Sequence, residues 1–147
     1  MIKKTLGVLV SVILLTGCSG TMINLGINEG RLQPCPKTPN CINSQSGTEG
    51  QKVQPINYTG AQKEAHERLL QIIKTEKRTK ILTVHGNYIR VEFTSALFRF
   101  VDDVEFYFPE VQKGEGVIHV RSASRVGHSD LGANRKRIER IRSKFSK

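Results

Sequence analysis

Apolar residues recur at helical spacing between residues 61 and 73, and charged residues fill the positions between them. This period places the apolar side chains on one face of a helix. Thr59, with Gln62 three residues later, matches a capping box that would start the helix. The predicted apolar face is formed by Ala61, Ala65, Leu69, Ile72 and Ile73.

A period of two follows this helix and predicts strands over residues 80–84, 87–95, 97–108 and 117–124. The stretch His85-Gly86-Asn87 is typical of a tight turn between the first two strands. Short connections of this kind predict an antiparallel meander with one buried face.

Helical spacing returns near the end of the chain. Leu131, Ile138, Ile141 and Phe145 define one face of a helix over residues 131–145, and Asp130 or Ser129 is the expected N-cap. The sequence therefore predicts an α+β domain, in which an antiparallel sheet of about four strands carries an N-terminal and a C-terminal helix on one face.

The first residues have the layout of a secretory signal peptide, with two lysines followed by a short apolar run. The sequence Leu15-Thr16-Gly17-Cys18 looks like a bacterial lipobox. This resemblance implies acyl chains such as palmitate on Cys18, and Ser19 after it favours the outer membrane, facing the periplasm. We expect a signal peptide over 1–17, a tether over 18–33 and a single domain over 34–147.

Cys35 and Cys41 remain once Cys18 carries lipid. Oxidising compartments favour disulfides, and Pro36 and Pro39 stiffen the short ring that these cysteines would close. Half of a zinc site is the alternative interpretation. The two cysteines do not have the spacing of a zinc knuckle and every histidine lies far away, so we expect a disulfide and no metal.

The formal net charge is +10, and the basic residues concentrate at the end of the chain. In a cytosolic protein this pattern would indicate nucleic-acid binding. Behind a lipoprotein signal the available anions are mainly lipid phosphates and acidic glycans, so we expect no nucleic-acid partner. The arginines of the last helix would form a solvated face or meet anionic headgroups; they are Arg135, Arg137, Arg140 and Arg142.

Alternation along residues 98–108 predicts a core face and an outer face. The core face would hold Phe98, Phe100, Asp102, Val104, Phe106 and Phe108, and the outer face Arg99, Asp103, Glu105 and Tyr107. We expect the adjacent strand to place Arg121 opposite Asp103, His119 opposite Glu105, Ser122 opposite Asp102 and Ser124 opposite Phe100.

Asp102 would lie among phenylalanines, where an unpaired charge is costly. Ser122, Ser124 and the free N–H groups of the last helix are candidate partners. Asp102 would then either clip that helix to the sheet or form the floor of a ligand pocket. In the second hypothesis Arg125 or Arg135 stands at the pocket mouth, and Asp130 belongs to the same segment.

No G-x-S-x-G elbow, H-E-x-x-H motif or P-loop occurs in the sequence. A Ser/His/Asp set is present only as neighbours in one segment, which is no evidence of triad geometry. We expect no catalytic residue and no cofactor. A hydrolase using Asp102 with the segment 122–130 is the alternative.

Three stretches together resemble a bacterial and plastid family, the Domain of Unknown Function fourteen ninety-nine. They are PCPKTPNCINSQ, YIRVEFTSALFRFVDDVEF and IHVRSASRVGHSDLGANRKRIERIR. The resemblance spans about residues 32–145 and implies a domain type without an assigned activity or catalytic residues. We therefore expect an envelope lipoprotein that binds an anionic or lipidic ligand or a partner protein, with a purely structural role as a further possibility.

Overall fold

A computed structural model describes residues 25–111 and 114–147 of the chain. The predicted signal peptide and Cys18 lie outside the described residues. The elements in order are β1 (Ile27–Asn28), β2 (Arg31–Leu32), β3 (Cys41–Asn43), the 3-10 helix η1 (Glu49–Gln51), β4 (Ile56–Thr59), α1 (Gln62–Thr75), β5 (Thr79–His85), β6 (Tyr88–Thr94), β7 (Val101–Tyr107), β8 (Glu115–Ser124) and α2 (Ala133–Phe145).

The main sheet is antiparallel and has six strands, in the order β3-β8-β7-β6-β5, with β4 also paired to β8. β8 is the longest strand and pairs with β7 along one edge and with β3 and β4 along the other. The prediction of about four strands was wrong because β3 and β4 are too short to show an alternating pattern. Since both precede α1, that helix is internal rather than N-terminal.

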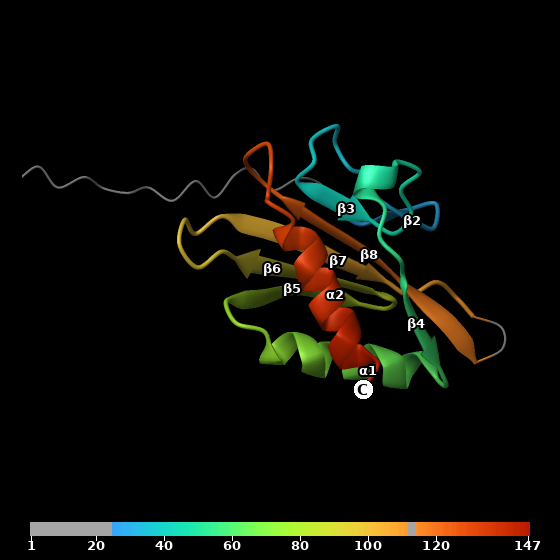
Figure 1. Cartoon of the computed structure of the whole chain (residues 1–147). Helices are drawn as coiled ribbons and strands as arrows, with labels where there is room; N and C mark the ends of the chain where they lie inside the picture. Colours follow the sequence, from blue (N-terminus) through green and yellow to red (C-terminus); the bar gives the residue numbers. More distant parts are fainter. Residues whose placement is uncertain (1–24, 112–113) are drawn as a thin grey trace, which may run out of the picture.

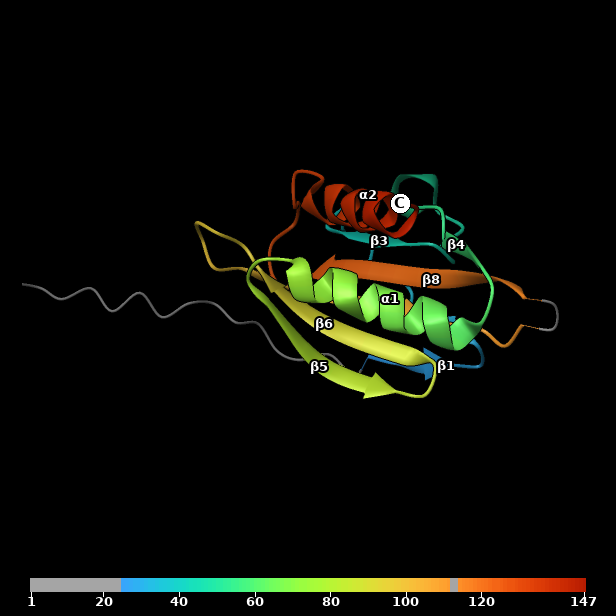
Figure 2. The ribbon, with the colours of Figure 1, turned by 90° about the horizontal axis from the view of Figure 1, so that it is seen from below.

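Both helices lie on the same face of this sheet (Figures 1 and 2). α1 buries Ala65, Leu69 and Ile73, as its helical spacing predicts. The sheet contributes a matching set of buried side chains, which includes Ile89, Val91, Phe93, Val104, Phe106, Ile118 and Val120. Burial of apolar surface between the two layers is the main force that holds the helices to the sheet.

The strand predicted over 97–108 begins only at Val101. Leu97, Phe98 and Phe100 are exposed in the loop before it, so their assignment to the core face was wrong. Arg99 has a φ of 57°, in the left-handed region, which breaks an extended strand. The alternation therefore applies only from Asp102 onward.

The register between β7 and β8 also differs from the prediction. Glu105, rather than Asp103, lies opposite Arg121, and Asp102 lies opposite Ser124. The hairpin of β7 and β8 is centred one residue later in the chain than predicted, so each residue of β7 faces a β8 residue two positions further along. Because side chains alternate along a strand, a shift of two leaves every side chain on the same face.

Both predicted helix starts need correction. Thr59 ends β4, where it pairs with Glu115, and Ala61 is the N-cap of α1 without a side-chain hydrogen bond, so the capping box is absent. α2 begins at Ala133 instead of residue 131. Leu131 is 88% exposed and does not join the apolar face of the helix.

The predicted disulfide between Cys35 and Cys41 is present. β1 and β2 form a small hairpin within the range predicted as a tether, and Leu32 at its end is buried. The first structural element of the domain thus lies inside that range. Within residues 25–111 and 114–147, no helix combines the length and apolar character needed to cross a bilayer.

Replacing Gly116 in β8 with Ala should destabilise the fold, because the new Cβ would lie 2.3 Å from Cζ of Tyr58 on β4. We expect a loss of about 2 kcal/mol in the free energy of unfolding, measured by urea denaturation. Gly47→Ala is the matched control, since a Cβ there meets nothing within 4 Å and the change should stay within about 0.5 kcal/mol. Equal stability of the two variants would contradict the close packing.

Candidate functional site

Asp102 lies on the helix-bearing face of the sheet and is buried, as predicted. Its partner, however, is Arg137, which the spacing of the basic residues had placed on the solvated or headgroup-binding face of α2. The Oδ2 atom of Asp102 accepts a hydrogen bond from Nη2 of Arg137 in α2 at 2.5 Å. The guanidinium of Arg137 also lies over the ring of Phe93, 4.7 Å from its centre. This buried ion pair joins α2 to β7 and β6.

A second set of hydrogen bonds extends this link to β8. The hydroxyl of Ser122 donates to Oδ1 of Asn134 at 2.5 Å and accepts from Nη1 of Arg137 at 3.0 Å. The side-chain amide of Asn134 donates to the carbonyl of Asn40 and to the hydroxyl of Ser124. The structure therefore joins Asp102, Ser122 and Ser124 in one network, through the side chains of Arg137 and Asn134 that lie between them.

Helical spacing could have identified both missed residues. Asn134 precedes Ile138 by four positions, and Arg137 precedes Ile141 by four, so both extend the apolar face of α2 toward its N-terminus. Arg137 is only 8% exposed, and its assignment to the solvated or headgroup-binding face was wrong.

The other predicted site residues occupy three different places. The carboxylate of Asp130 accepts the backbone N–H groups of Gly132 and Asn134, although Gly132 is the N-cap of α2. Arg135 donates to the carbonyl of Gly50 on the surface. Arg125 lies on the opposite face of the sheet, where it pairs with Asp103.

Replacing Asp102 with Asn distinguishes the two roles considered for this residue. If Asp102 is a clip, the change leaves Arg137 buried without its counter-charge, and the free energy of unfolding should fall by about 3 kcal/mol in urea denaturation. If Asp102 is instead the floor of a pocket, ligand is lost while stability hardly changes. Glu139→Gln is the control, because Glu139 is half exposed in its pair with Arg142 and should matter by less than about 1 kcal/mol.

The sheet face away from the helices carries a network of buried charges. Asp103 accepts from Nε of Arg125 at 2.7 Å and from Nη2 of Arg90 at 2.8 Å, and Arg125 also pairs with Glu92. Burial alone would raise the pKa of the Asp103 carboxyl, but hydrogen bonds from Arg125 and Arg90 hold that pKa below its ordinary value.

Glu105 forms a second group on the same face, next to the N-terminal hairpin. It accepts from Arg121 at 3.2 Å, from the hydroxyl of Tyr88 at 2.7 Å and from the backbone N–H of Gly26 at 3.0 Å. These charged side chains pair with one another across strands, but Asp103 pairs with Arg125 and Arg90 rather than with the predicted Arg121, whose partner is Glu105.

The lowered pKa of Asp103 predicts acid sensitivity. Asp103 stabilises the fold above the pKa of the unfolded chain, about 4, and that contribution is lost as the pH falls through the lower pKa of the folded state. We expect the free energy of unfolding of Asp103→Asn to decline less steeply than that of the wild type below about pH 5.

Glu49→Gln changes an exposed carboxylate in η1 and serves as the control for that comparison, which needs only urea titrations at a series of pH values. If the free energy of unfolding falls equally steeply with pH in the wild type and in Asp103→Asn, the role given to Arg90 and Arg125 is contradicted.

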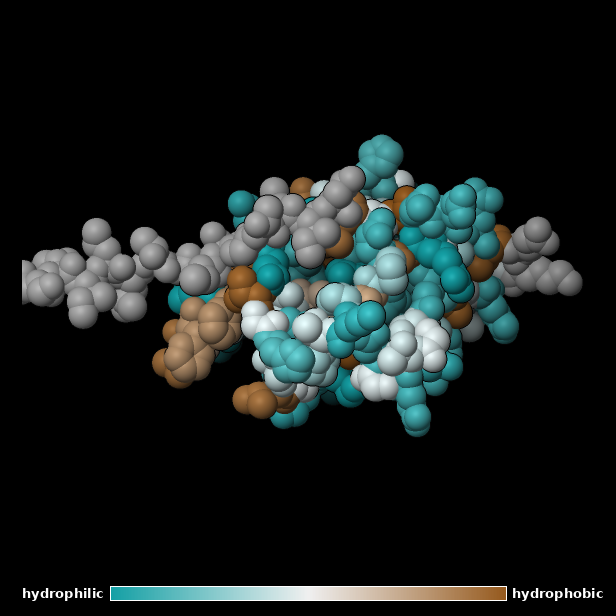
Figure 3. Space-filling view, turned by 90° about the horizontal axis from the view of Figure 1, so that it is seen from above, coloured by the Kyte–Doolittle hydropathy of each residue, from teal (hydrophilic) through white to brown (hydrophobic). Residues whose placement is uncertain are grey.

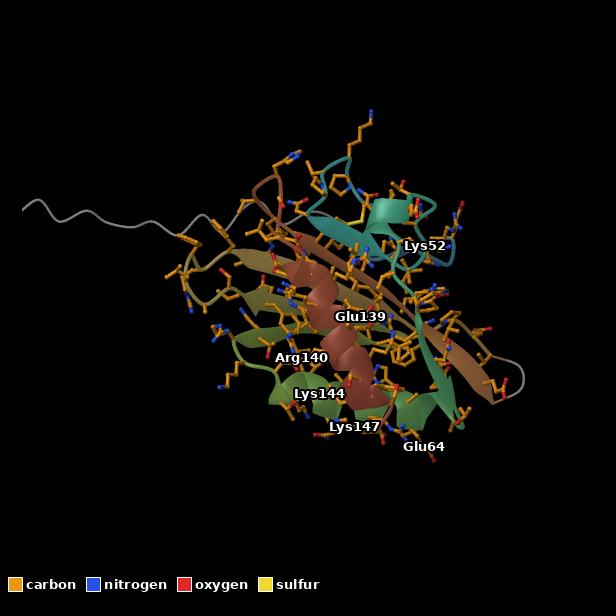
Figure 4. The ribbon with its side chains drawn as sticks, viewed as in Figure 1. Lys52, Glu64, Glu139, Arg140, Lys144 and Lys147 are labelled. Atoms are coloured by element: carbon orange, nitrogen blue, oxygen red, sulfur yellow. A yellow bond between two sulfur atoms is a disulfide. The ribbon has the colours of Figure 1, made fainter. Side chains whose placement is uncertain are left out.

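The arginines and lysines toward the C-terminal end of α2 are partly engaged in pairs between elements. Nη2 of Arg140 and Nζ of Lys144 each lie 2.7 Å from the carboxylate of Glu76, just after α1. Figure 4 shows both cations on the part of α2 that runs toward α1. Arg142 donates to the carbonyl of Gln54, ahead of β4, and to Glu139. Much of the basic helix therefore ties α2 to its neighbours.

An open cleft of about 740 Å³ lies between β4, the start of β8, the end of α2 and the middle of α1. Its volume falls in the usual range for small-molecule sites. The residues that line it come from β4, α1, β8 and the end of α2, and they are Asn57, Tyr58, Thr59, Arg68, Glu115, Gly116, Val117, Phe145, Ser146 and Lys147. Sequence reasoning missed this cleft because only the fold brings these separate segments together.

Two side chains in the cleft have the properties of ligand-binding groups. Arg68 has no carboxylate at ion-pairing distance in the described part of the chain, and its guanidinium lies 5.4 Å from the ring centre of Phe145. The hydroxyl of Tyr58 is buried and has no hydrogen-bond partner among the described residues. Burial raises the pKa of this hydroxyl, so it remains a hydrogen-bond donor near neutral pH.

Residues 31–145 match the model of one protein family, described as Protein of unknown function (DUF1499). The chain belongs to this family. Membership in the DUF1499 family confirms the predicted domain type over nearly the same range and assigns no activity. No curated protein matches the chain. Among residues 25–111 and 114–147, no three His, Cys, Asp or Glu side chains gather as a metal site would require.

Proposed function

We propose that this DUF1499 protein is a lipid-anchored, non-enzymatic binding protein of the bacterial envelope, whose domain binds an anionic and partly apolar small molecule in the cleft beside Arg68. Cys18 would carry the lipid, and the domain would face the periplasm from the outer membrane.

The anchor and the compartment are supported by the sequence before Cys18 and by the disulfide. A signal-like apolar run ends in Leu15-Thr16-Gly17-Cys18. The bond between Cys35 and Cys41 fits an oxidising compartment, where such bridges persist.

The ligand class follows from the lining of the cleft, and the presence of Arg68 and Tyr58 in one cleft is the observation that carries the proposal. An uncommitted guanidinium favours a carboxylate, phosphate or sulfate group. A buried hydroxyl without a partner gains most from an acceptor that enters the cleft. Phe145 and Val117 supply apolar surface for the rest of the ligand.

The hydrolase alternative gains no support from the contacts of Ser122. Its hydroxyl donates to the amide oxygen of Asn134, which cannot take up a proton as a general base does. Asp102, the other proposed member, is paired with Arg137. A binding role in the cleft therefore accounts for more of the observed geometry.

Replacing Arg68 with Gln should weaken binding of an anionic, partly apolar molecule about ten-fold, because one charge-assisted hydrogen bond is lost. The measurement is native mass spectrometry of the purified protein after exposure to envelope extract. Titration with anilinonaphthalene sulfonate, an anionic aromatic probe, gives the affinity of each variant.

Lys74→Gln is the matched control, since Lys74 is an exposed cation on the same helix and does not line the cleft. The proposal requires a retained mass that Lys74→Gln keeps and Arg68→Gln loses. Equal retention by both variants would place the ligand elsewhere, and no retained mass with the wild type would favour a protein partner or a structural role.

A further inference from the structure

The loop between β6 and β7 exposes large apolar side chains. Leu97 is 79% exposed, Phe98 67% and Phe100 43%. The rings of Phe98 and Phe100 stack on each other with their centres 5.6 Å apart. Single apolar residues on a surface are ordinary, but several in one loop indicate a surface that something else covers.

This loop has a defined shape. The backbone N–H of Ser95 donates to the carbonyl of Phe100 at 2.8 Å, and the N–H of Phe100 donates back to the hydroxyl of Ser95 at 2.9 Å. These two bonds close the loop at its base, and the left-handed residue Arg99 turns the chain between the two phenylalanines. The apolar side chains are therefore presented by a closed loop.

Exposed cations lie within and beside the loop at this end of the molecule. β5 begins, β6 ends, β7 begins and β8 ends there, so the connections between them lie together (Figures 1 and 2). Apolar surface gathers at the same end in the space-filling view (Figure 3). The exposed residues of these connections include Lys77, Arg78, Arg99 and Leu131.

The position of Cys18 fits a membrane as the occupant. The N–H of Gly26 is bonded to Glu105 in the middle of β7, about 14 Å along that strand from its start next to the loop. Six residues lie between Cys18 and Leu25, so the seven steps from one Cα to the next span at most about 24 Å when fully extended. A lipid on Cys18 can therefore reach the level of the loop.

We propose that the β6–β7 loop inserts Leu97, Phe98 and Phe100 into the bilayer that holds the Cys18 lipid, while Lys77, Arg78 and Arg99 meet anionic headgroups. Apolar side chains flanked by cations are the chemistry of interfacial insertion. This inference rests on the proposed anchorage. The loop and the lipid would together fix the orientation of the domain, with the cleft at the far end of β8 facing away from the membrane.

The test uses a tryptophan reporter, because the chain contains no tryptophan. Full-length, lipidated Phe98→Trp is reconstituted into vesicles of phosphatidylethanolamine and phosphatidylglycerol. We expect a blue-shifted emission that lipids with brominated acyl chains quench several-fold more strongly than they quench Val84→Trp. Val84 is 48% exposed at the opposite end of the sheet, beside the turn between β5 and β6.

Flotation of the same vesicles separates this inference from the anchorage. Vesicles that carry the protein but leave Phe98→Trp unquenched would overturn insertion and keep the anchor. A wild-type chain that does not float would overturn the anchor itself. Emission that shifts with protein concentration and is not quenched by brominated lipid would show that a second copy of the chain covers the loop, which also overturns insertion.

Discussion

The arrangement of this domain depends on the buried ion pair between Asp102 and Arg137. Each charge would be costly in the core without the other, so the pair is stable only when α2 lies at one position over β7. At this position Asn134 accepts a hydrogen bond from the hydroxyl of Ser122 on the same face of the sheet. Apolar burial holds both helices against the sheet, and the polar network selects where α2 begins and how it is oriented.

The contacts around this ion pair show which polar and charged residues hold the domain together and which surfaces are left for a function. The conspicuous stretch around residues 121–142 supplies contacts within the domain, through Arg121, Arg125, Asn134 and Arg137. Among the described residues, two surfaces have a chemistry that contacts within the domain do not explain, and they lie at opposite ends of β8. One is the cleft beside Arg68, and the other is the apolar loop between β6 and β7. An anchored protein with its loop in the bilayer would leave the cleft open to the aqueous side.

Helical spacing and alternation can be recognised within a single segment, and they predicted the two helices and the longer strands of the sheet. Alternation predicted the strand over residues 87–95, in which Ile89, Val91 and Phe93 are buried, and the Gly86-Asn87 turn joined the correct strands. The alternation was extended too far at Phe98 and Phe100, because a closed loop shows the same apolar residues as a strand. The expected burial of Asp102 implied that it needs a partner, as a clip or as the floor of a pocket, but the choice of Arg137 depends on how α2 packs, which charge patterning alone does not reveal. The cleft depends on four segments distant in sequence, so no pattern could have predicted it.

A double-mutant cycle on Asp102 and Arg137 tests the central claim most directly, because it measures the coupling between the two side chains independently of their other contacts. The single variants Asp102→Asn and Arg137→Gln and the double variant would be compared by urea denaturation. The account predicts a coupling of about 2 kcal/mol, with the double variant much less destabilised than the sum of the single changes. Additive effects would contradict it, because they would mean that the two residues stabilise the fold separately and that α2 is held to the sheet by other contacts.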